Sequence, residues 1–377
     1  MWEPNGIYSK FSLKIPTVLF GIMAINGLKN YPVSKVAVIH GKGLTEDQKQ
    51  NIANTIHAFD VCFIAKSWEG EPELGTLKET LAVVEKFQPD LFIAIGGGSV
   101  IDGAKLVRVF YEFPFLDKDS RNFNLLNFNT KFIVIPTTIG SGAEISSASV
   151  LYNPVEKTKD FFLSHAFIPD VIIIDPVFIC EASDNILFSS MIDALSHIIE
   201  GYVSVVDNQI ADIYAEKALQ IIFQKWESFH KSREPLIALD LQLAALWAGI
   251  VQNHCIVGAA HGLAHQLSAY HFSHSTAISL VLPAVITRNS MDENANMRYE
   301  KLIKASGIEG GVPGLIEMID RIIAVANNKV EKNRFKSELP HIMKDSQFFL
   351  NAIKDKGAQG NPIPLSETLY MEILKTL

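Results

Sequence analysis

The sequence predicts two domains, an α/β domain built on a doubly wound parallel sheet and an all-helical domain after it. Short apolar runs alternate with helical patterns as far as Asp175, and every pattern beyond Pro176 is helical. A chain of 377 residues is also long for a single hydrophobic core. We therefore expect an α/β domain at residues 1–176 and an all-helical domain at residues 177–377.

The first half of the chain supplies the alternating elements. Thr45 precedes Glu46 and Asp47, which is typical of a helix N-cap followed by an acidic first turn. The run Leu91–Ile95 is apolar throughout, as expected for a strand that is buried on both faces of a parallel sheet. The predicted strands are Ser34–His40, Val61–Ile64, Leu91–Ile95, Lys131–Ile135 and Val171–Asp175, and the predicted helices are Thr45–His57, Leu74–Phe87 and Val100–Phe110.

Two glycine-rich loops follow predicted strands. Gly96-Gly97-Gly98-Ser99 lies between a strand and a helix, where free backbone N–H groups bind phosphate. Ser99, with Asp102 three residues later, also has the spacing of a capping box. The second loop, Pro136–Glu144, supplies glycines and the hydroxyl groups of Thr137, Thr138 and Ser141. Either loop alone is consistent with a plain turn, but the two together favour a nucleotide-binding domain.

The second half is predicted to be helical, with long periodic segments at Ile192–Val205, Ile210–Phe229 and Leu236–Val251. It contains a tract, Leu241–Thr287, without any Asp, Glu, Lys or Arg. A tract so apolar should be buried, and buried imidazoles need partners for their ring nitrogens. Four histidines fall within fourteen residues of this tract, namely His261, His265, His271 and His274.

These histidines suggest a metal site, a proton relay, or both. His261 and His265 are four residues apart and share a helical face, as do Asp193 and His197. One Asp with three His is a ligand set that suits Fe(II), Zn(II) or a similar divalent ion. The alternative is a group of core histidines bonded to backbone carbonyls, which is more plausible for one histidine than for four.

Composition excludes other classes of protein. A net charge of −8 without a basic cluster argues against a nucleic-acid partner. The N-terminus has no basic region followed by an apolar run, so no signal peptide is expected. The stretch Leu241–Ala260 approaches the length of a membrane span, but Gln242, Gln252 and Asn253 interrupt it and favour a buried helix. Three widely spaced cysteines without CxxC predict reduced residues in a cytoplasmic protein.

The motifs together resemble those of the iron-containing (group III) alcohol dehydrogenase family. After the two glycine-rich loops, the family order continues with Asp193-Ala194-Leu195-Ser196-His197-Ile198-Ile199-Glu200-Gly201-Tyr202, His261-Gly262-Leu263-Ala264-His265, Leu282-Pro283 and Asn361-Pro362. The resemblance covers nearly the whole chain, and the block that begins at Asp193 is specific. It implies a dehydroquinate synthase-like architecture and reversible hydride transfer between a primary alcohol or aldehyde and NAD(P). By analogy it also implies a homodimer, with Ile7–Leu13 as an edge strand.

The resemblance implies roles for individual residues. Asp193, His197, His261 and His274 would bind the metal, usually Fe²⁺, with Zn²⁺ or another divalent ion as the alternative. His265 matches a position associated with proton transfer, and Lys159 matches a lysine beside the nicotinamide. The nucleotide and the metal would meet in a cleft between the two domains. The other implied nucleotide-binding residues are Gly41, Gly96, Gly97, Gly98, Ser99, Asp102, Thr137, Thr138 and Ser141.

Three features depart from the family pattern. Ser273 and Ser275 flank His274 where the family has proline and glycine, and the spacing from His261 is one residue shorter, so His271 stays open as an alternative ligand. Because thirteen residues of continuous helix would turn His274 about 140° away from His261, the chain must bend around residues 268–273. Gly41 replaces an aspartate after the first strand.

The replacement at Gly41 bears on the choice of coenzyme. An acidic residue at this place bonds the adenine ribose hydroxyls, and its charge repels a 2′-phosphate. Gly41 leaves room for the phosphate, and Lys42 and His40 offer donors to it. We therefore predict that NADP(H) is used at least as well as NAD(H).

Three other functions fit parts of the pattern. One is a lyase of the dehydroquinate synthase kind, which needs basic residues for a phosphate and a carboxylate; the uncharged tract supplies none. Another is a reductase of a charged aldehyde, such as a phosphonate or a semialdehyde. The third is a metal-free relative with a binding role, supported by the altered residues around His274.

Overall fold

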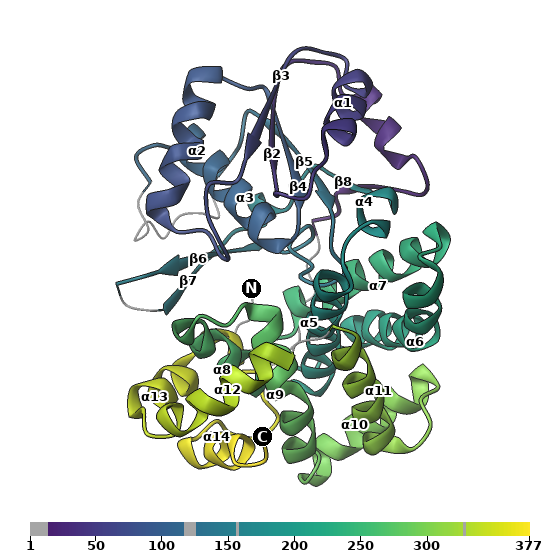
Figure 1. Ribbon diagram of the computed structural model, residues 1–377, viewed down its shortest axis with the longest axis vertical. Coiled ribbons are helices and arrows are strands. Elements are labelled where there is room, and N and C mark those ends of the chain that lie inside the picture. The colour runs from purple at the N-terminus through teal and green to yellow at the C-terminus, as the bar shows by residue number, and fades with distance from the viewer. Residues whose placement is uncertain (1–13, 117–125, 156–157, 327–328) are drawn as a thin grey trace. The chain divides into compact units, whose positions relative to one another are not determined.

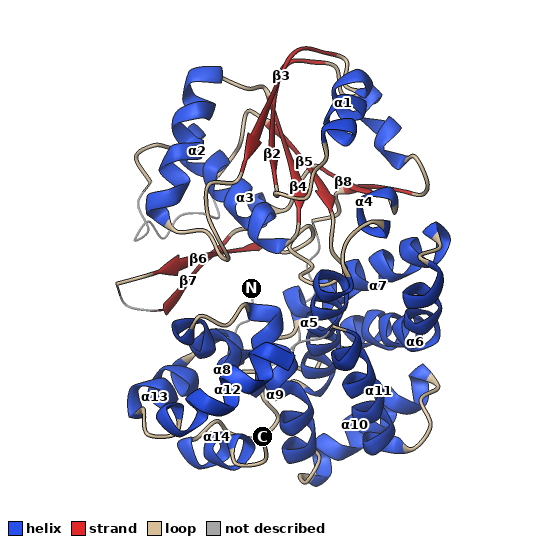
Figure 2. Cartoon of the chain, viewed as in Figure 1, coloured by secondary structure: helices blue, strands red, loops and turns tan. Residues whose placement is uncertain are grey.

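A computed structural model describes residues 14–116, 126–155, 158–326 and 329–377. They form two compact units. The sheet unit contains the described residues up to Ala182 together with Arg233–Gln242, and the helical unit contains Ser183–Ser232 and Leu243–Leu377. Figure 2 shows the strands in the sheet unit. The edge strand expected at Ile7–Leu13 lies outside the described residues.

Within the described residues the sheet unit has a six-stranded sheet in which all neighbours are parallel. In spatial order its strands are β1 (Thr17–Phe20), β8 (Val171–Ile174), β5 (Lys131–Pro136), β4 (Leu91–Gly96), β2 (Val33–His40) and β3 (Ala58–Ala65). The chain runs outward from β2 to β3 and then continues on the other side with β4 and β5. Sheets of this kind bind ligands at the carboxyl ends of the strands, beside such a switch point.

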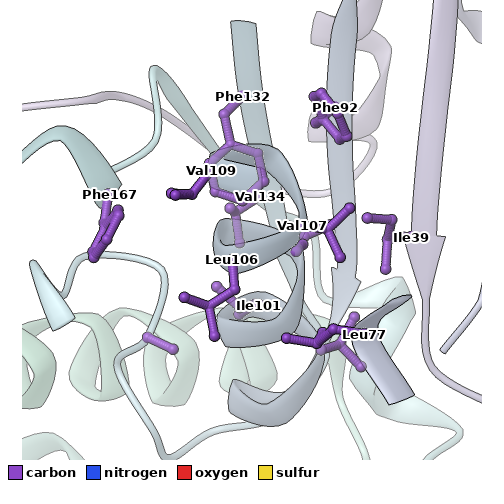
Figure 3. Close-up of a cluster of buried hydrophobic side chains, with 14 of the residues drawn as sticks. Ile39, Leu77, Phe92, Ile101, Leu106, Val107, Val109, Phe132, Val134 and Phe167 are labelled. Atoms are coloured by element: carbon purple, nitrogen blue, oxygen red, sulfur yellow. The ribbon is translucent and has the colours of Figure 1, made fainter. Parts of the chain in front are cut away.

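Helices cover both faces of this sheet (Figure 1). They are α2 (Leu74–Phe87) and α3 (Gly98–Glu112) on one face, and α1 (Glu46–Thr55) with the 3-10 helix η1 (Ala24–Asn30) on the other. Along β4, Phe92 joins the core under α2 and α3, drawn in Figure 3, whereas Ile93 joins the core under α1. Double burial explains why this strand is apolar throughout.

The helical unit confirms the all-helical prediction for the second half of the chain. Its described helices are α5 (Asp184–Val203), α6 (Gln209–Ser232), most of α7 (Pro235–His254), α8 (Ala259–Leu267), α9 (His274–Asn289), α10 (Glu293–Ser306), α11 (Gly311–Val325), α12 (Lys329–Ile342), α13 (Ser346–Lys354) and α14 (Glu367–Leu374). A short helix, α4 (Val177–Cys180), belongs to the sheet unit.

Two of the described helices, α5 and α7, have the length and hydropathy of a membrane span. The most apolar stretch of α5 is 89% buried inside the protein and that of α7 is 56% buried. Burial within the fold therefore accounts for much of their apolar composition.

The local predictions succeed at one helix start and fail at another. Thr45 caps α1 in a capping box: its hydroxyl accepts the Gln48 N–H, and the Gln48 side chain accepts the Thr45 N–H. The capping box predicted for Ser99 and Asp102 is wrong, because α3 begins at Gly98 with Gly97 as N-cap. Ser99 is already inside the helix, and its hydroxyl donates to the Gly70 carbonyl.

The sequence patterns also miss three strands. Strand β1 has four residues and lies at the edge of the sheet. Strands β6 (Ala148–Asn153) and β7 (Thr158–Leu163) form a separate antiparallel pair. The polar residues of β6 and β7 hide these two strands from a search for apolar runs, and β1 is short for such a search.

Candidate functional site

One carboxylate and three imidazoles meet in the helical unit. Oδ1 of Asp193 lies 3.3 Å from Nε2 of His274, 3.6 Å from Nε2 of His197 and 3.9 Å from Nε2 of His261. One candidate ligand atom from each of Asp193, His261 and His274 lies within 4.8 Å of the others. The ring of His197 stacks on that of His261 with centroids 5.0 Å apart. The fold thus brings the four predicted metal ligands together.

Local structure accounts for this convergence. Asp193 and His197 are one turn apart on α5, while α8 carries His261. After α8 the chain passes through the 3-10 helix η4 (Ser268–Tyr270) and reverses at His271, whose φ of 62° lies in the left-handed region. This confirms the predicted bend.

The bend leads directly into α9. Ser273 accepts the Thr276 N–H as the N-cap of α9, so that His274 is the first residue of the helix. The serine that stands in place of the family's proline therefore has a structural task, which is to start this helix. His271 is exposed and does not belong to the group around Asp193.

The cluster fits a divalent cation. Oδ1 of Asp193 and Nε2 of His261 are buried and have no hydrogen-bond partner among the described residues. Burial raises the pKa of the Asp193 carboxyl, but the imidazoles of His197 and His274 outweigh it and hold that pKa below its ordinary value. Ligand atoms bound tetrahedrally at about 2.1 Å from a metal are about 3.4 Å apart, which is close to the three distances around Asp193.

Glu200 orients His261. Its Oε2 accepts the Nδ1 proton of His261 at 2.6 Å, and its Oε1 accepts the Ala260 N–H at 2.8 Å. With its proton on Nδ1, the ring of His261 carries its lone pair on Nε2, the nitrogen nearer to Asp193. A buried carboxylate in this position fixes the tautomer of a metal-binding imidazole and raises its basicity.

The Asn361-Pro362 motif completes the start of α8. Oδ1 of Asn361 accepts the Ala259 N–H at 3.1 Å and the Asn289 side-chain N–H at 2.9 Å. The N-cap is Gly258, and a Cβ there would lie 2.8 Å from Asn361 Oδ1 and 2.9 Å from Glu200 Oε1. Only glycine therefore lets both acceptors reach the first amides of the helix that carries His261.

His265 is paired with Asp355. Nδ1 of His265 donates to Oδ2 of Asp355 at 2.8 Å, and both side chains are buried. The other carboxylate oxygen of Asp355 accepts the Gly357 N–H at 2.8 Å. The ring of His265 stacks on that of His274, with centroids 5.3 Å apart. His265 therefore adjoins the cluster around Asp193, with its lone pair on Nε2.

In the sheet unit the two glycine-rich loops pack against each other. A Cβ on Gly97 would lie 3.0 Å from Cγ2 of Thr138, and one on Gly98 would lie 2.8 Å from Cβ of Ser141. A Cβ on Gly96 would lie 2.5 Å from the Val100 side chain, and the Thr137 N–H donates to the Gly96 carbonyl at 3.1 Å. Only glycines allow this close packing. It places the N-terminus of α3 beside the hydroxyl groups of the second loop, and both kinds of group can bind a pyrophosphate.

The other predicted nucleotide residues lie elsewhere in the sheet unit. The N–H of Gly41, just beyond β2, donates to the Ile95 carbonyl at 3.1 Å, which places this glycine beside the end of β4. Asp102 accepts the Val150 N–H and lies 3.6 Å from Lys105, and burial, opposed by Lys105, raises its pKa to about 6. Lys159 on β7 is ion-paired with Glu71 at 2.5 Å.

Two residues of the helical site had no predicted role. Glu200 belongs to the motif that begins at Asp193, and its spacing of seven residues from Asp193 and three from His197 places it on the same face of α5. Helical periodicity could therefore have identified it. Asp355 lies 90 residues from His265 in the sequence and carries no such signal.

The chain matches two family models, iron-containing alcohol dehydrogenase over residues 16–176 and the C-terminal part of the Fe-containing alcohol dehydrogenase family over residues 187–377. It is 33% identical to the 1-propanol dehydrogenase PduQ of Citrobacter freundii over 238 residues, which cover 62% of this chain and 61% of that protein. It is 29% identical to the NADPH-dependent butanol dehydrogenase of Clostridium saccharobutylicum over 297 residues, which cover 76% and 73% of the two chains.

Other similar proteins differ in how much of their own length the match covers. The match to the aldehyde-alcohol dehydrogenase of Streptococcus pneumoniae, 30% identical over 270 residues, covers 65% of this chain but only 31% of that protein's length. The fold is similar to the iron-containing alcohol dehydrogenase of Thermococcus thioreducens, with a TM-score of 0.84 at 24% identity over 97% of this chain and 99% of that chain.

The ligand set can be tested by metal content. We expect Asp193→Ala, His197→Ala and His274→Ala each to lose the bound metal while the far-UV circular dichroism stays unchanged, because each removes one of four converging donors. His271→Ala is the matched control and should keep wild-type metal content. A His271→Ala protein without metal, beside a metal-loaded His274→Ala protein, would make His271 the ligand.

The role of Glu200 can be tested by metal affinity. We expect Glu200→Gln to weaken metal binding about ten- to hundredfold, because the amide cannot hold the His261 proton as a carboxylate does. Glu216→Gln, which alters a carboxylate that accepts the Tyr202 hydroxyl, is the control. Competition with a chelator measures both, and unchanged affinity in Glu200→Gln would mean that Glu200 only caps α8.

Proposed function

The chain belongs to the iron-containing alcohol dehydrogenase family, and we propose that it catalyses reversible, metal-dependent hydride transfer between a primary alcohol and its aldehyde with NAD(P). The observation that carries this proposal is the buried Asp193 carboxylate beside three imidazole nitrogens. The same cluster argues against a metal-free binding protein, because an uncompensated buried carboxylate costs several kcal/mol.

We propose that Asp193, His197, His261 and His274 hold the metal, Fe²⁺ or alternatively Zn²⁺ or another divalent ion. When bound, the metal would supply Lewis acidity at the substrate oxygen, and the nicotinamide would carry the hydride. Glu200 keeps the His261 proton on Nδ1. Asp355 keeps the His265 proton on Nδ1, so that Nε2 of His265 can accept the alcohol proton and return it during aldehyde reduction.

The nucleotide is proposed to bind at the sheet unit, with its pyrophosphate on Gly96, Gly97, Gly98 and Ser99 and with Thr137, Thr138 and Ser141 beside it. Asp102 would support the loop from within α3, and Lys159 would line the nicotinamide side. We propose that NADP(H) is used at least as well as NAD(H), because Gly41 leaves space for a 2′-phosphate. Among the described residues, its chain neighbours aside, a Cβ on Gly41 would have only Val100 Cγ2, at 3.5 Å, within 4 Å. A relative named for its dependence on NADPH supports this choice.

The proposal extends to a homodimer in the cytoplasm. All three cysteines are free, as expected in a reducing compartment. Strand β1 is an edge of the sheet, and the nearby Phe20, Ile22 and Met23 are exposed apolar residues. Such an edge is suited to pairing with a second chain.

Activity and metal content together test the function. Protein purified without oxygen should contain about one divalent metal per chain, and it should oxidise NADPH in the presence of short aliphatic aldehydes. The Asp193→Ala protein should lack both the metal and the activity while its fold is retained. Metal-loaded wild-type protein that reduces no aldehyde and oxidises no alcohol with either coenzyme would refute the proposal.

The coenzyme preference can be tested at Gly41. We expect Gly41→Asp to shift the ratio of kcat/KM for NADPH and NADH towards NADH about ten- to hundredfold, equivalent to about 1–3 kcal/mol, because a carboxylate there repels the 2′-phosphate. Gly41→Asn, similar in size but neutral, should shift the ratio much less. A strong wild-type preference for NADH would contradict the argument.

A further inference from the structure

The carboxyl ends of β4, β2 and β3 lie side by side in that order. The Gly41 N–H donates to the Ile95 carbonyl of β4, and the Lys66 N–H donates to the His40 carbonyl of β2 at 2.9 Å. Lys66 follows β3 directly, as Gly41 follows β2. The glycine that takes the place of an acidic residue therefore has a lysine as its lateral neighbour, which the linear sequence does not reveal.

The side chain of Lys66 extends towards α3. Its Nζ donates to the Ser99 hydroxyl at 3.2 Å and lies 3.4 Å from the Gly70 carbonyl. Because β2 lies between β3 and β4, a side chain that starts at β3 and reaches Ser99 passes the end of β2. The ammonium group therefore lies at the carboxyl end of the sheet, between the end of β3 and the loop proposed for the pyrophosphate.

Lys66 and Lys42 have different surroundings. The Lys66 side chain is partly buried, and burial lowers its pKa while Glu69 opposes this. The Lys42 side chain is 69% exposed and is ion-paired with Glu69, itself 81% exposed. Solvent screens an exposed cation, whereas a partly buried ammonium interacts more strongly with a phosphate because the local dielectric constant is lower.

We propose that Lys66, rather than Lys42, binds the 2′-phosphate of NADP(H) and thereby determines the coenzyme preference. This inference rests on the proposed function, since it requires the dinucleotide to lie with its pyrophosphate on the loop at Gly96–Ser99. In nucleotide domains of this kind the adenine ribose lies at the end of the strand next to the one that precedes the glycine-rich loop. Here that strand is β2, and the residue after it is Gly41. Lys66 would exchange its contacts with Ser99 and Gly70 for charge-assisted hydrogen bonds to phosphate oxygens.

The test uses two adenosine fragments that differ only in the 2′-phosphate, 2′,5′-ADP and 5′-AMP. Their binding to the purified, metal-loaded protein is measured by isothermal titration calorimetry at fixed ionic strength. We expect Lys66→Gln to weaken 2′,5′-ADP binding about ten- to hundredfold and to change 5′-AMP binding less than about twofold. Lys66→Arg should retain the discrimination, and Lys42→Gln should change it less than about threefold.

Each contrary outcome has a distinct meaning. Equal weakening of both fragments in Lys66→Gln would show that Lys66 only supports the loop around Ser99, and a loss confined to Lys42→Gln would assign the phosphate to Lys42; either refutes the inference. Wild-type protein that binds 5′-AMP as tightly as 2′,5′-ADP refutes this inference alone, because hydride transfer with NAD(H) would still stand. Wild-type protein that binds neither fragment refutes the nucleotide site and this inference together.

Discussion

A buried carboxylate with three imidazoles around it is the interaction around which the polar residues of the candidate site are arranged. Asp193 lies in α5 among the apolar residues Ile192 and Ala194, where an ionised group without compensation would be costly. Within the described part of the chain, Oδ1 of Asp193 accepts no hydrogen bond. A positive charge held among the imidazoles would compensate this carboxylate, and a divalent metal ion bound by the four side chains would supply that charge.

The surrounding polar residues follow from that arrangement. An imidazole can donate its lone pair to a metal only from an unprotonated nitrogen, so the proton must be held on the other side of the ring. Glu200 does this for His261, and Asp355 holds the equivalent proton of His265. Both carboxylates also accept a backbone N–H, so the groups that tune the rings also fix the chain around them.

The sequence predicts features that depend on neighbouring residues, but not contacts between segments that are distant in the chain. The apolar strand at Leu91–Ile95, the cap at Thr45 and the bend before His274 are local consequences of composition and spacing, and all three are observed. The neighbours of His265 and Gly41 come from other segments of the chain. Asp355 bonds His265 because α13 packs against α8, and Lys66 is the neighbour of Gly41 because of the strand order; no spacing in the linear sequence encodes either. The capping box at Ser99 failed for a third reason, because glycine rather than serine begins the helix.

The geometry of α5 also determines which changes of length the protein can accept. Asp193, His197 and Glu200 share one helical face, so a single inserted or deleted residue between them would rotate one group by about 100° relative to the others. The segment from Ser268 to Ser273 is different, because its left-handed residue and its separate cap reset the direction of the chain before α9 begins. In evolution, single-residue insertions and deletions should therefore accumulate between α8 and α9 and be purged from α5.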